Sequence, residues 1–162
     1  MFTDLKDSTL MTTVHGDTKA LHLLHIHNAL VRQALREHRG REVKHTGDGV
    51  MASFARVPDG LECATAIQKA FAAHNQANPC EVLHVRIGLS AGEPIEEHGD
   101  LFGSAVQLAA RICAAAEPDE ILVAQVVRDH CLGLDHLFSD LREIRPKGFD
   151  RSVQVCQIRW AG

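Results

Sequence analysis

The sequence has no long hydrophobic run, and its longest apolar stretches, such as residues 105–110, are far shorter than the ~20 residues that span a bilayer. The first residues, MFTDLKD, contain no apolar segment of the kind that secretory signals carry. The five cysteines are scattered and form no CxxC pair, which favours reduced thiols. These absences predict a cytoplasmic location and no membrane segment in this chain.

An excess of positive charge is also missing. Seventeen Lys and Arg residues face 21 Asp and Glu residues, for a formal net charge of −4. This balance argues against a general nucleic-acid partner, because phosphate backbones select basic surfaces. A nucleotide substrate stays possible, since a few local charges and a metal can hold a triphosphate.

Repeats, low-complexity segments and long linkers are absent as well. With 162 residues, the chain has the length of one domain with a real core. We therefore expect residues 1–162 to form a single domain.

The chain has eleven histidines, and His22, His25 and His27 are clustered. No Cys or carboxylate lies at ligand spacing from them, which favours ordinary helix residues over a zinc site.

The hydrophobic pattern predicts alternating strands and helices. Residues 42–46 and 50–54 flank a Gly-Asp-Gly turn and read as a β-hairpin. Helices are expected at residues 17–38, 58–75, 104–115 and near 126–131, and strands at 82–95, 120–124, 138–144 and 153–160. Residues 99–103 read as a turn. This order indicates an α+β fold, with a ferredoxin-like antiparallel sheet core and helices packed on one face.

The first strand is unusual, because only Met1, Phe2 and Thr3 precede Asp4. A central strand needs about five residues. Either the native chain begins further upstream, so that the first strand is truncated here, or the strand is short.

Two carboxylates stand out by their surroundings. Asp4 is expected to end the first strand, before a polar loop, and Asp48 lies at the tip of the hairpin between Gly47 and Gly49. Aspartates at strand ends can hold a divalent cation such as Mg²⁺ through hard oxygen ligands. Taken alone, however, Gly-Asp-Gly also fits an ordinary hairpin turn.

Four segments change that balance. They are Phe2–Thr9 (FTDLKDST), Lys44–Phe54 (KHTGDGVMASF), Arg86–Gly92 (RIGLSAG) and Gly99–Ile112 (GDLFGSAVQLAARI). In this order and at these intervals, they resemble the successive signatures of class III adenylate and guanylate cyclases. The resemblance extends over nearly the whole chain and implies the class III nucleotide cyclase fold.

The resemblance assigns the metal and phosphate ligands. Asp4 and Asp48 match the two metal-binding aspartates, and the backbone carbonyl of Leu5 matches a further ligand. It implies two divalent cations per site, Mg²⁺ or Mn²⁺, which promote attack of the 3′-hydroxyl of ATP on its own α-phosphate with release of pyrophosphate. Backbone N–H groups around Ser8 and Thr9 would hold phosphate oxygens.

The resemblance also assigns the residues that select the nucleotide base. Lys44 matches the family's base-reading lysine, and Asp100 matches its partner. Lysine only donates hydrogen bonds and aspartate only accepts them, which suits N1 and N6 of adenine. Guanine reverses both groups, so the pair favours ATP and formation of 3′,5′-cyclic AMP. Without the resemblance, each residue would read as an ordinary surface residue.

Arg111 matches the arginine that stabilises the transition state, a role that suits a permanent charge with a forked donor. Two positions depart from the family. Gln107 stands four residues before Arg111, where asparagine is usual, and its longer side chain is expected to shift its catalytic contact with the ribose or phosphate. Asp7 stands where glycine is usual, in the loop over the phosphates, and would repel a triphosphate unless Lys6 or a metal compensates.

In this family each site is shared by two subunits, and this chain carries both sets of residues. The resemblance therefore implies a head-to-tail homodimer with two equivalent sites, together with a fused or associated regulatory domain. Two alternatives remain. In the first, the chain is a catalytically weak, cyclase-like domain for dimerisation or nucleotide sensing, and Gln107 and Asp7 favour this alternative. In the second, the chain is a guanylate cyclase, and Lys44 and Asp100 disfavour it.

Overall fold

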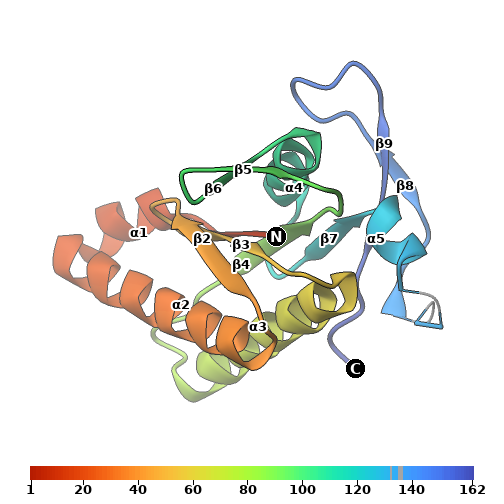
Figure 1. Ribbon diagram of the computed structural model, residues 1–162. Helices are drawn as coiled ribbons and strands as arrows, with labels where there is room; N and C mark the ends of the chain where they lie inside the picture. Colours follow the sequence, from red (N-terminus) through yellow and green to blue (C-terminus); the bar gives the residue numbers. More distant parts are fainter. Residues whose placement is uncertain (132, 135–136) are drawn as a thin grey trace.

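The computed structural model describes residues 1–131, 133–134 and 137–162. The elements in chain order are β1 (Phe2–Leu5), α1 (Ser8–His15), α2 (Asp17–Glu37), β2 (Arg41–His45), β3 (Gly49–Ser53), α3 (Val57–Ala77), β4 (Val85–Leu89), β5 (Ile95–Glu97), β6 (Asp100–Phe102), α4 (Ser104–Ala115), β7 (Ile121–Ala124), α5 (Gln125–Asp129), β8 (Arg142–Ile144) and β9 (Val153–Gln157). Figure 1 shows their arrangement.

A seven-stranded sheet forms the centre, in the order β2-β3-β1-β4-β7-β9-β8. Its first four strands have the ferredoxin-like order, which confirms the predicted fold class. Six neighbouring pairs make up the sheet; five are antiparallel, while β4 and β7 run parallel. The parallel pair departs from the purely antiparallel prediction. It is possible because the connection between these strands includes α4, and parallel neighbours need such a long crossover.

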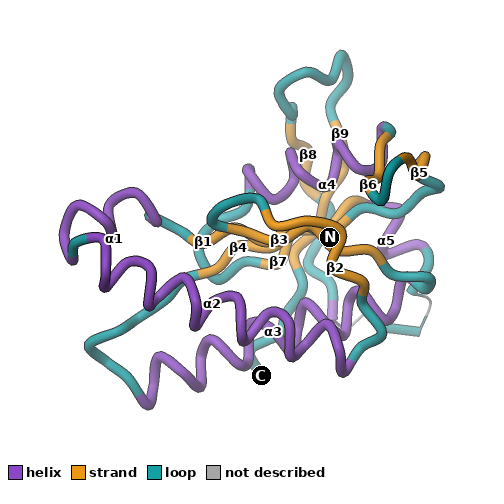
Figure 2. Tube along the Cα trace, turned by 60° about the vertical axis from the view of Figure 1, so that its left-hand side comes forward, coloured by secondary structure: helices purple, strands orange, loops and turns teal. Residues whose placement is uncertain are grey.

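Helices cover both faces of the sheet, whereas the sequence predicted one covered face. α2 and α3 pack on one face and α4 lies on the other (Figures 1 and 2). Because successive strand residues point to opposite faces, β7 serves two cores. Ile121 and Val123 belong to the larger cluster, which includes residues of α2 and α3, while Leu122 packs in a smaller cluster with Ile112 of α4.

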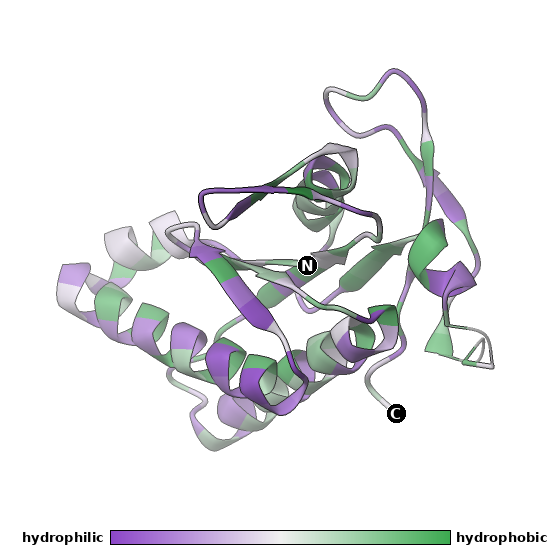
Figure 3. Cartoon of the chain, viewed as in Figure 1, coloured by the Kyte–Doolittle hydropathy of each residue, from purple (hydrophilic) through white to green (hydrophobic). Residues whose placement is uncertain are grey.

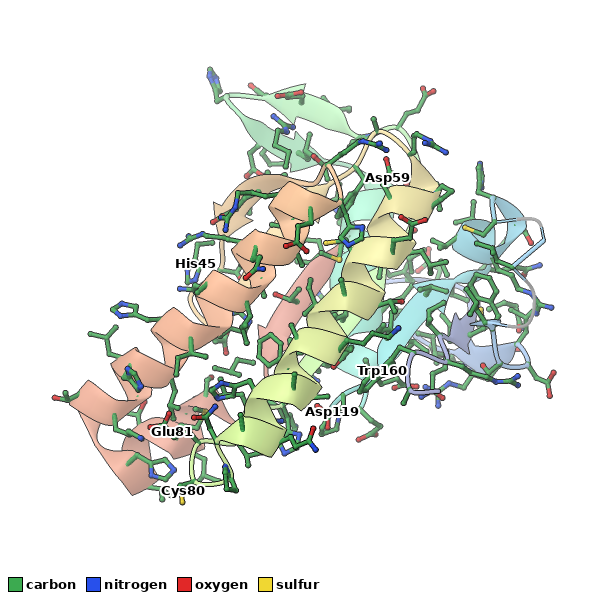
Figure 4. All side chains as sticks on the ribbon, turned by 90° about the horizontal axis from the view of Figure 1, so that it is seen from below. His45, Asp59, Cys80, Glu81, Asp119 and Trp160 are labelled. Carbon is green, nitrogen blue, oxygen red and sulfur yellow. The ribbon has the colours of Figure 1, made fainter. Side chains whose placement is uncertain are left out.

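The long helices follow the predicted periodicity. α2 alternates between hydrophilic and hydrophobic bands (Figure 3), and its buried residues include Leu23, Val31 and Leu35. α2 and α3 run side by side beneath the sheet (Figure 4). α4 occupies the predicted residues 104–115. Its backbone passes so close to β4 that a Cβ on Gly88 would lie 2.3 Å from the Cys113 nitrogen. A glycine within a strand allows such a close approach of a neighbouring backbone.

Four local predictions were wrong. The strand expected at residues 82–95 is limited to β4, and the turn expected at 99–103 is part of a β5–β6 hairpin. The polar residues after Asp7 form α1 rather than a loop. β1 continues past Asp4 to Leu5, so Asp4 lies within the strand and faces Arg86 of β4. Asp4 and Asp100 lie in strands because pairing with β4 and β5, rather than their own periodicity, fixes them.

Candidate active site

Asp4 and Asp48 lie at the same end of the β1–β3 pair. Asp4 is paired in register with Gly49, the residue after Asp48. The Leu5 N–H donates to the Asp48 carbonyl over 2.8 Å. Gly49 is required here, because a Cβ at this position would lie 1.9 Å from the Thr3 carbonyl oxygen. Pairing β1 with the hairpin thus brings two aspartates together across 44 residues of sequence, as the sequence analysis predicted.

Arg86 holds the Asp4 carboxylate. Its Nε donates to Asp4 Oδ2 at 2.8 Å, and its second terminal nitrogen lies 2.7 Å from the same oxygen. The Asp4 side chain is 26% exposed. Burial raises the pKa of Asp4, the Arg86 hydrogen bond opposes this, and the nearby Asp48 adds to it, with a raised pKa as the net result. A cation placed beside Asp4 would therefore stabilise its ionised form.

Asp48 is held by α1. Ser8 Oγ donates to Asp48 Oδ2 over 2.8 Å. Ser8 is also the first residue of α1, whose first-turn N–H groups have no intrahelical acceptor and point out of the helix end. A cleft of about 470 Å³ is lined by Asp4, Leu5, Ser8, Thr9 and Asp48 together with Arg86 and their neighbours. Two aspartates, the first residues of α1 and an arginine therefore line one open cleft.

The donor set fits a divalent cation whose coordination is completed by a phosphate. Among the described residues, no three His, Cys, Asp or Glu side chains are grouped closely enough to hold a metal by themselves. Asp4 and Asp48 supply carboxylates, and Leu5 follows Asp4 in β1 with its N–H bonded to the Asp48 carbonyl. Mg²⁺ is commonly bound by one or two carboxylates plus substrate phosphates, so two suffice for a site that also takes a triphosphate.

Lys44 and Asp100 meet although 56 residues separate them. Lys44 Nζ lies 2.7 Å from Asp100 Oδ2, and the Leu101 N–H donates to the other carboxylate oxygen at 2.8 Å. The hydrogen bonds from Lys44 and Leu101 keep the pKa of Asp100 below its usual range. The pair joins β2 to the β5–β6 hairpin and presents a donor beside an acceptor.

Gln107 and Arg111 lie apart from these groups. Both are exposed on α4, four residues apart and so on one face of the helix. Neither lines the cleft that contains Asp4 and Asp48. A more enclosed, largely apolar cavity of about 180 Å³ lies between β1, β3, β4 and α4, and none of the predicted site residues lines it.

The site contains one prominent residue that sequence reasoning did not select. Arg86 contacts Asp4 and also donates to the Ala114 carbonyl at 2.8 Å. The signal was available, because Arg86 is the one charged residue in the strand Val85–Leu89, between the buried Val85 and Ile87. Its pairing with β1 was not visible from that strand alone.

The fold and this clustering define a nucleotide cyclase domain. The family model of the adenylate and guanylate cyclase catalytic domain matches residues 1–156. The chain therefore belongs to this family.

Individual relatives agree. The chain is 35% identical over 122 residues to a putative adenylate cyclase of Rhizobium meliloti, covering 73% of this chain and 20% of that protein. It is 37% identical over 157 residues to an uncharacterized protein of Mycobacterium tuberculosis, covering 97% of this chain and 40% of that protein. A crystal structure of an adenylate/guanylate cyclase/hydrolase from Silicibacter pomeroyi matches with a TM-score of 0.82 at 31% identity, covering 97% and 94% of the two chains. The chain thus spans less than half the length of these two sequence relatives.

Proposed function

We propose that residues 1–162 form one catalytic domain that converts ATP into 3′,5′-cyclic AMP and pyrophosphate. The observation that carries this proposal is the convergence of Asp4 and Asp48 beside the first turn of α1. Relatives named as adenylate cyclases support it, although a guanylyl cyclase structure shares the fold with a TM-score of 0.83 at 20% identity.

The chain's own residues would prepare the triphosphate for cyclisation. Asp4, Asp48 and the Leu5 carbonyl would hold two divalent cations, Mg²⁺ or Mn²⁺. When bound, these ions would lower the pKa of the 3′-hydroxyl and neutralise charge on the phosphates. The N–H groups at Ser8 and Thr9 would orient phosphate oxygens, and Arg86, which neutralises Asp4, stands in the same cleft.

Base selection would rest on Lys44 and Asp100. Their 2.7 Å pair places a donor next to an acceptor, which matches N1 and N6 of adenine. Guanine would leave both groups mismatched, so GTP should be the poorer substrate.

A second copy would complete the site. Gln107 and Arg111 do not line the cleft of their own chain, so we propose that they act on the nucleotide held by the partner of a head-to-tail homodimer. Arg111 would stabilise charge on the phosphorane-like transition state, and Gln107 would contact the ribose or phosphate.

We also propose a cytoplasmic setting and an associated regulatory domain, since cyclic nucleotide output requires control. Among the described residues, none of the helices combines the length and apolarity that crossing a bilayer requires.

Purified protein with ATP or GTP and Mg²⁺ or Mn²⁺, assayed for cyclic product, tests the proposal. Asp48→Asn keeps the size of the side chain and removes its charge, so we expect activity to fall roughly 10³-fold if the ligand contributes ~4 kcal/mol. Unchanged activity would remove the metal assignment. GTP preference would overturn the role of Lys44 and Asp100.

A weak cyclase that acts as a nucleotide-sensing or dimerisation module is the second candidate. The observation that favours it is Asp7, whose charge stands at the start of α1 beside the cleft, with Lys6 Nζ 3.8 Å away. ATP binding without cyclic product, in an otherwise folded dimer, would support this candidate.

A further inference from the structure

A chain of hydrogen bonds leads from the helical core to the turn that carries Asp48. The Gly47 N–H donates to His45 Nδ1 over 3.2 Å. His45 Nε2 lies 3.0 Å from Asn28 Oδ1, and His27 Nδ1 lies 3.0 Å from the same oxygen. Figure 4 shows His45 beside α2, the helix that carries His27 and Asn28.

The backbone fixes the polarity of this chain. A backbone N–H can only donate, so His45 Nδ1 must be the unprotonated, accepting nitrogen. In neutral His45 the proton then lies on Nε2 and needs an acceptor, which sets the orientation of the Asn28 amide with Oδ1 toward it. His27 meets the same Oδ1, so His27 carries its proton on Nδ1.

His27 anchors the inner end. It is 0% exposed and packs edge-on against Phe71, with ring centroids 5.7 Å apart. Its Nε2 has no hydrogen-bond partner among the described residues. Burial lowers the pKa of His27, with the Asn28 hydrogen bond acting against it, so burial favours the neutral ring. Packing holds this ring rigidly, so the Asn28 oxygen between the two rings has a fixed position.

The opposite side of the turn is held by other elements. The Leu5 N–H donates to the Asp48 carbonyl, and Ser8 Oγ donates to its carboxylate, both over 2.8 Å. Gly47 has a φ of 87°, a conformation that favours glycine, and the Thr46 N–H closes the turn by donating to the Gly49 carbonyl over 2.9 Å. His45 supplies the hydrogen bond there.

We propose that His45, Asn28 and His27 are positioning residues that clamp the Gly47–Asp48 turn from the side of α2 and thereby fix the metal-holding carboxylate. The inference rests on the proposed function, which assigns the Asp48 carboxylate to a metal ion. The hydrogen bonds that form the clamp do not depend on that assignment. Partners behind a ligand orient it, and their loss typically weakens metal binding 10–100-fold.

Mn²⁺ titration of the nucleotide-free chain, followed by electron paramagnetic resonance, tests the clamp. His45→Phe and Asn28→Leu should weaken Mn²⁺ binding about tenfold. His45→Asn should recover affinity to within about threefold, because an Asn oxygen accepts readily from the N–H two residues on. His25→Phe on the exposed face of α2 is the matched control and should bind as the wild type does.

Imidazole nitrogen NMR provides the second readout. We expect His45 with an unprotonated Nδ1 and His27 with an unprotonated Nε2. The opposite tautomer at His45, or wild-type Mn²⁺ affinity in His45→Phe, would overturn the proposal. If the wild type binds Mn²⁺ and shows these tautomers but makes no cyclic product, the proposed function fails and the clamp stands. If the wild type binds no Mn²⁺, both the metal assignment and the positioning role fall.

Discussion

Asp7, which stands where the resemblance leads us to expect glycine, occupies a backbone position that favours glycine. Its φ is 58°, in the left-handed region, and it precedes α1 without capping the helix through its side chain. Aspartate tolerates this conformation better than most residues. The carboxylate is 61% exposed, with Lys6 as a loose partner, so it points largely toward solvent. The departure is therefore compatible with the fold, and its consequence is electrostatic.

Substitutions at Asp7 should separate the effect of its charge from the effect of its backbone conformation. Asp7→Gly and Asp7→Asn both remove the charge near the triphosphate, while asparagine keeps the tolerance of positive φ. We expect both to lower the KM for ATP by roughly fivefold, the effect of about 1 kcal/mol of repulsion at close range in water. Steady-state kinetics measure it. If only the glycine variant responds, loop freedom rather than charge is responsible.

Gly49 provides a sharper test of how close β1 must come to the hairpin. A Cβ there would lie 1.9 Å from the Thr3 carbonyl oxygen, so Gly49→Ala must push β1 and β3 apart. We expect a loss of ~1–3 kcal/mol in the free energy of unfolding and loss of cyclase activity, because Asp4 and Asp48 separate.

The matched control is Gly60→Ala in α3. The nearest atoms to its new Cβ belong to the Phe54 side chain, at 3.2 Å, which can move. Alanine also favours helix over glycine, so this variant should keep near-normal stability. Urea denaturation of both variants makes the comparison. Equal stability of the two would contradict the close approach seen at Gly49.

At the scale of elements, α2 contains a buried titratable group. Burial lowers the pKa of His27 below the 6.5 of an exposed histidine. Below pH 6.5 the unfolded chain therefore takes up a proton that the folded chain resists. The stability contributed by neutral His27 is present above that pH. It is lost progressively as the pH falls from 6.5 toward the folded pKa.

We expect the free energy of unfolding of the wild type to decline between pH 7 and 5 more steeply than that of His27→Leu. Chemical denaturation at several pH values provides the measurement. His25→Leu, at an exposed position of the same helix, should keep the wild-type slope. Equal slopes for the wild type and His27→Leu would show that another group controls the acid sensitivity.

The elements that sequence could predict are those with strong local signals. The Gly47–Gly49 turn between strand-like runs predicted β2 and β3, and helical periodicity predicted α2, α3 and α4. The failures depended on tertiary contacts. The sequence did not predict that α4 covers the second face of the sheet, nor that Arg86 pairs with Asp4. Both features depend on the position of β4 between β1 and β7. No local pattern contains that neighbourhood, although the motif order placed Asp4 and Asp48 together correctly.

At the scale of the whole molecule, the decisive feature is the division of the proposed site residues between two surfaces. Asp4 and Asp48 share one cleft, while Arg111 is exposed on α4 outside it. If a second copy supplies Arg111, two different inactive variants can rescue each other. A mixed dimer of Asp48→Asn and Arg111→Ala has one site with both defects and one site with none.

Equal mixing of the two variants should therefore restore about a quarter of the wild-type activity, because half of the dimers are mixed and each has one intact site of two. Each variant alone should have nearly none. The assay is cyclic product formation after co-incubation at a concentration that permits exchange of subunits, with either variant mixed with itself as the control. Activity of the mixture no greater than the average of the two variants would mean that Arg111 does not act across a dimer. The exposed α4 face would then need another explanation.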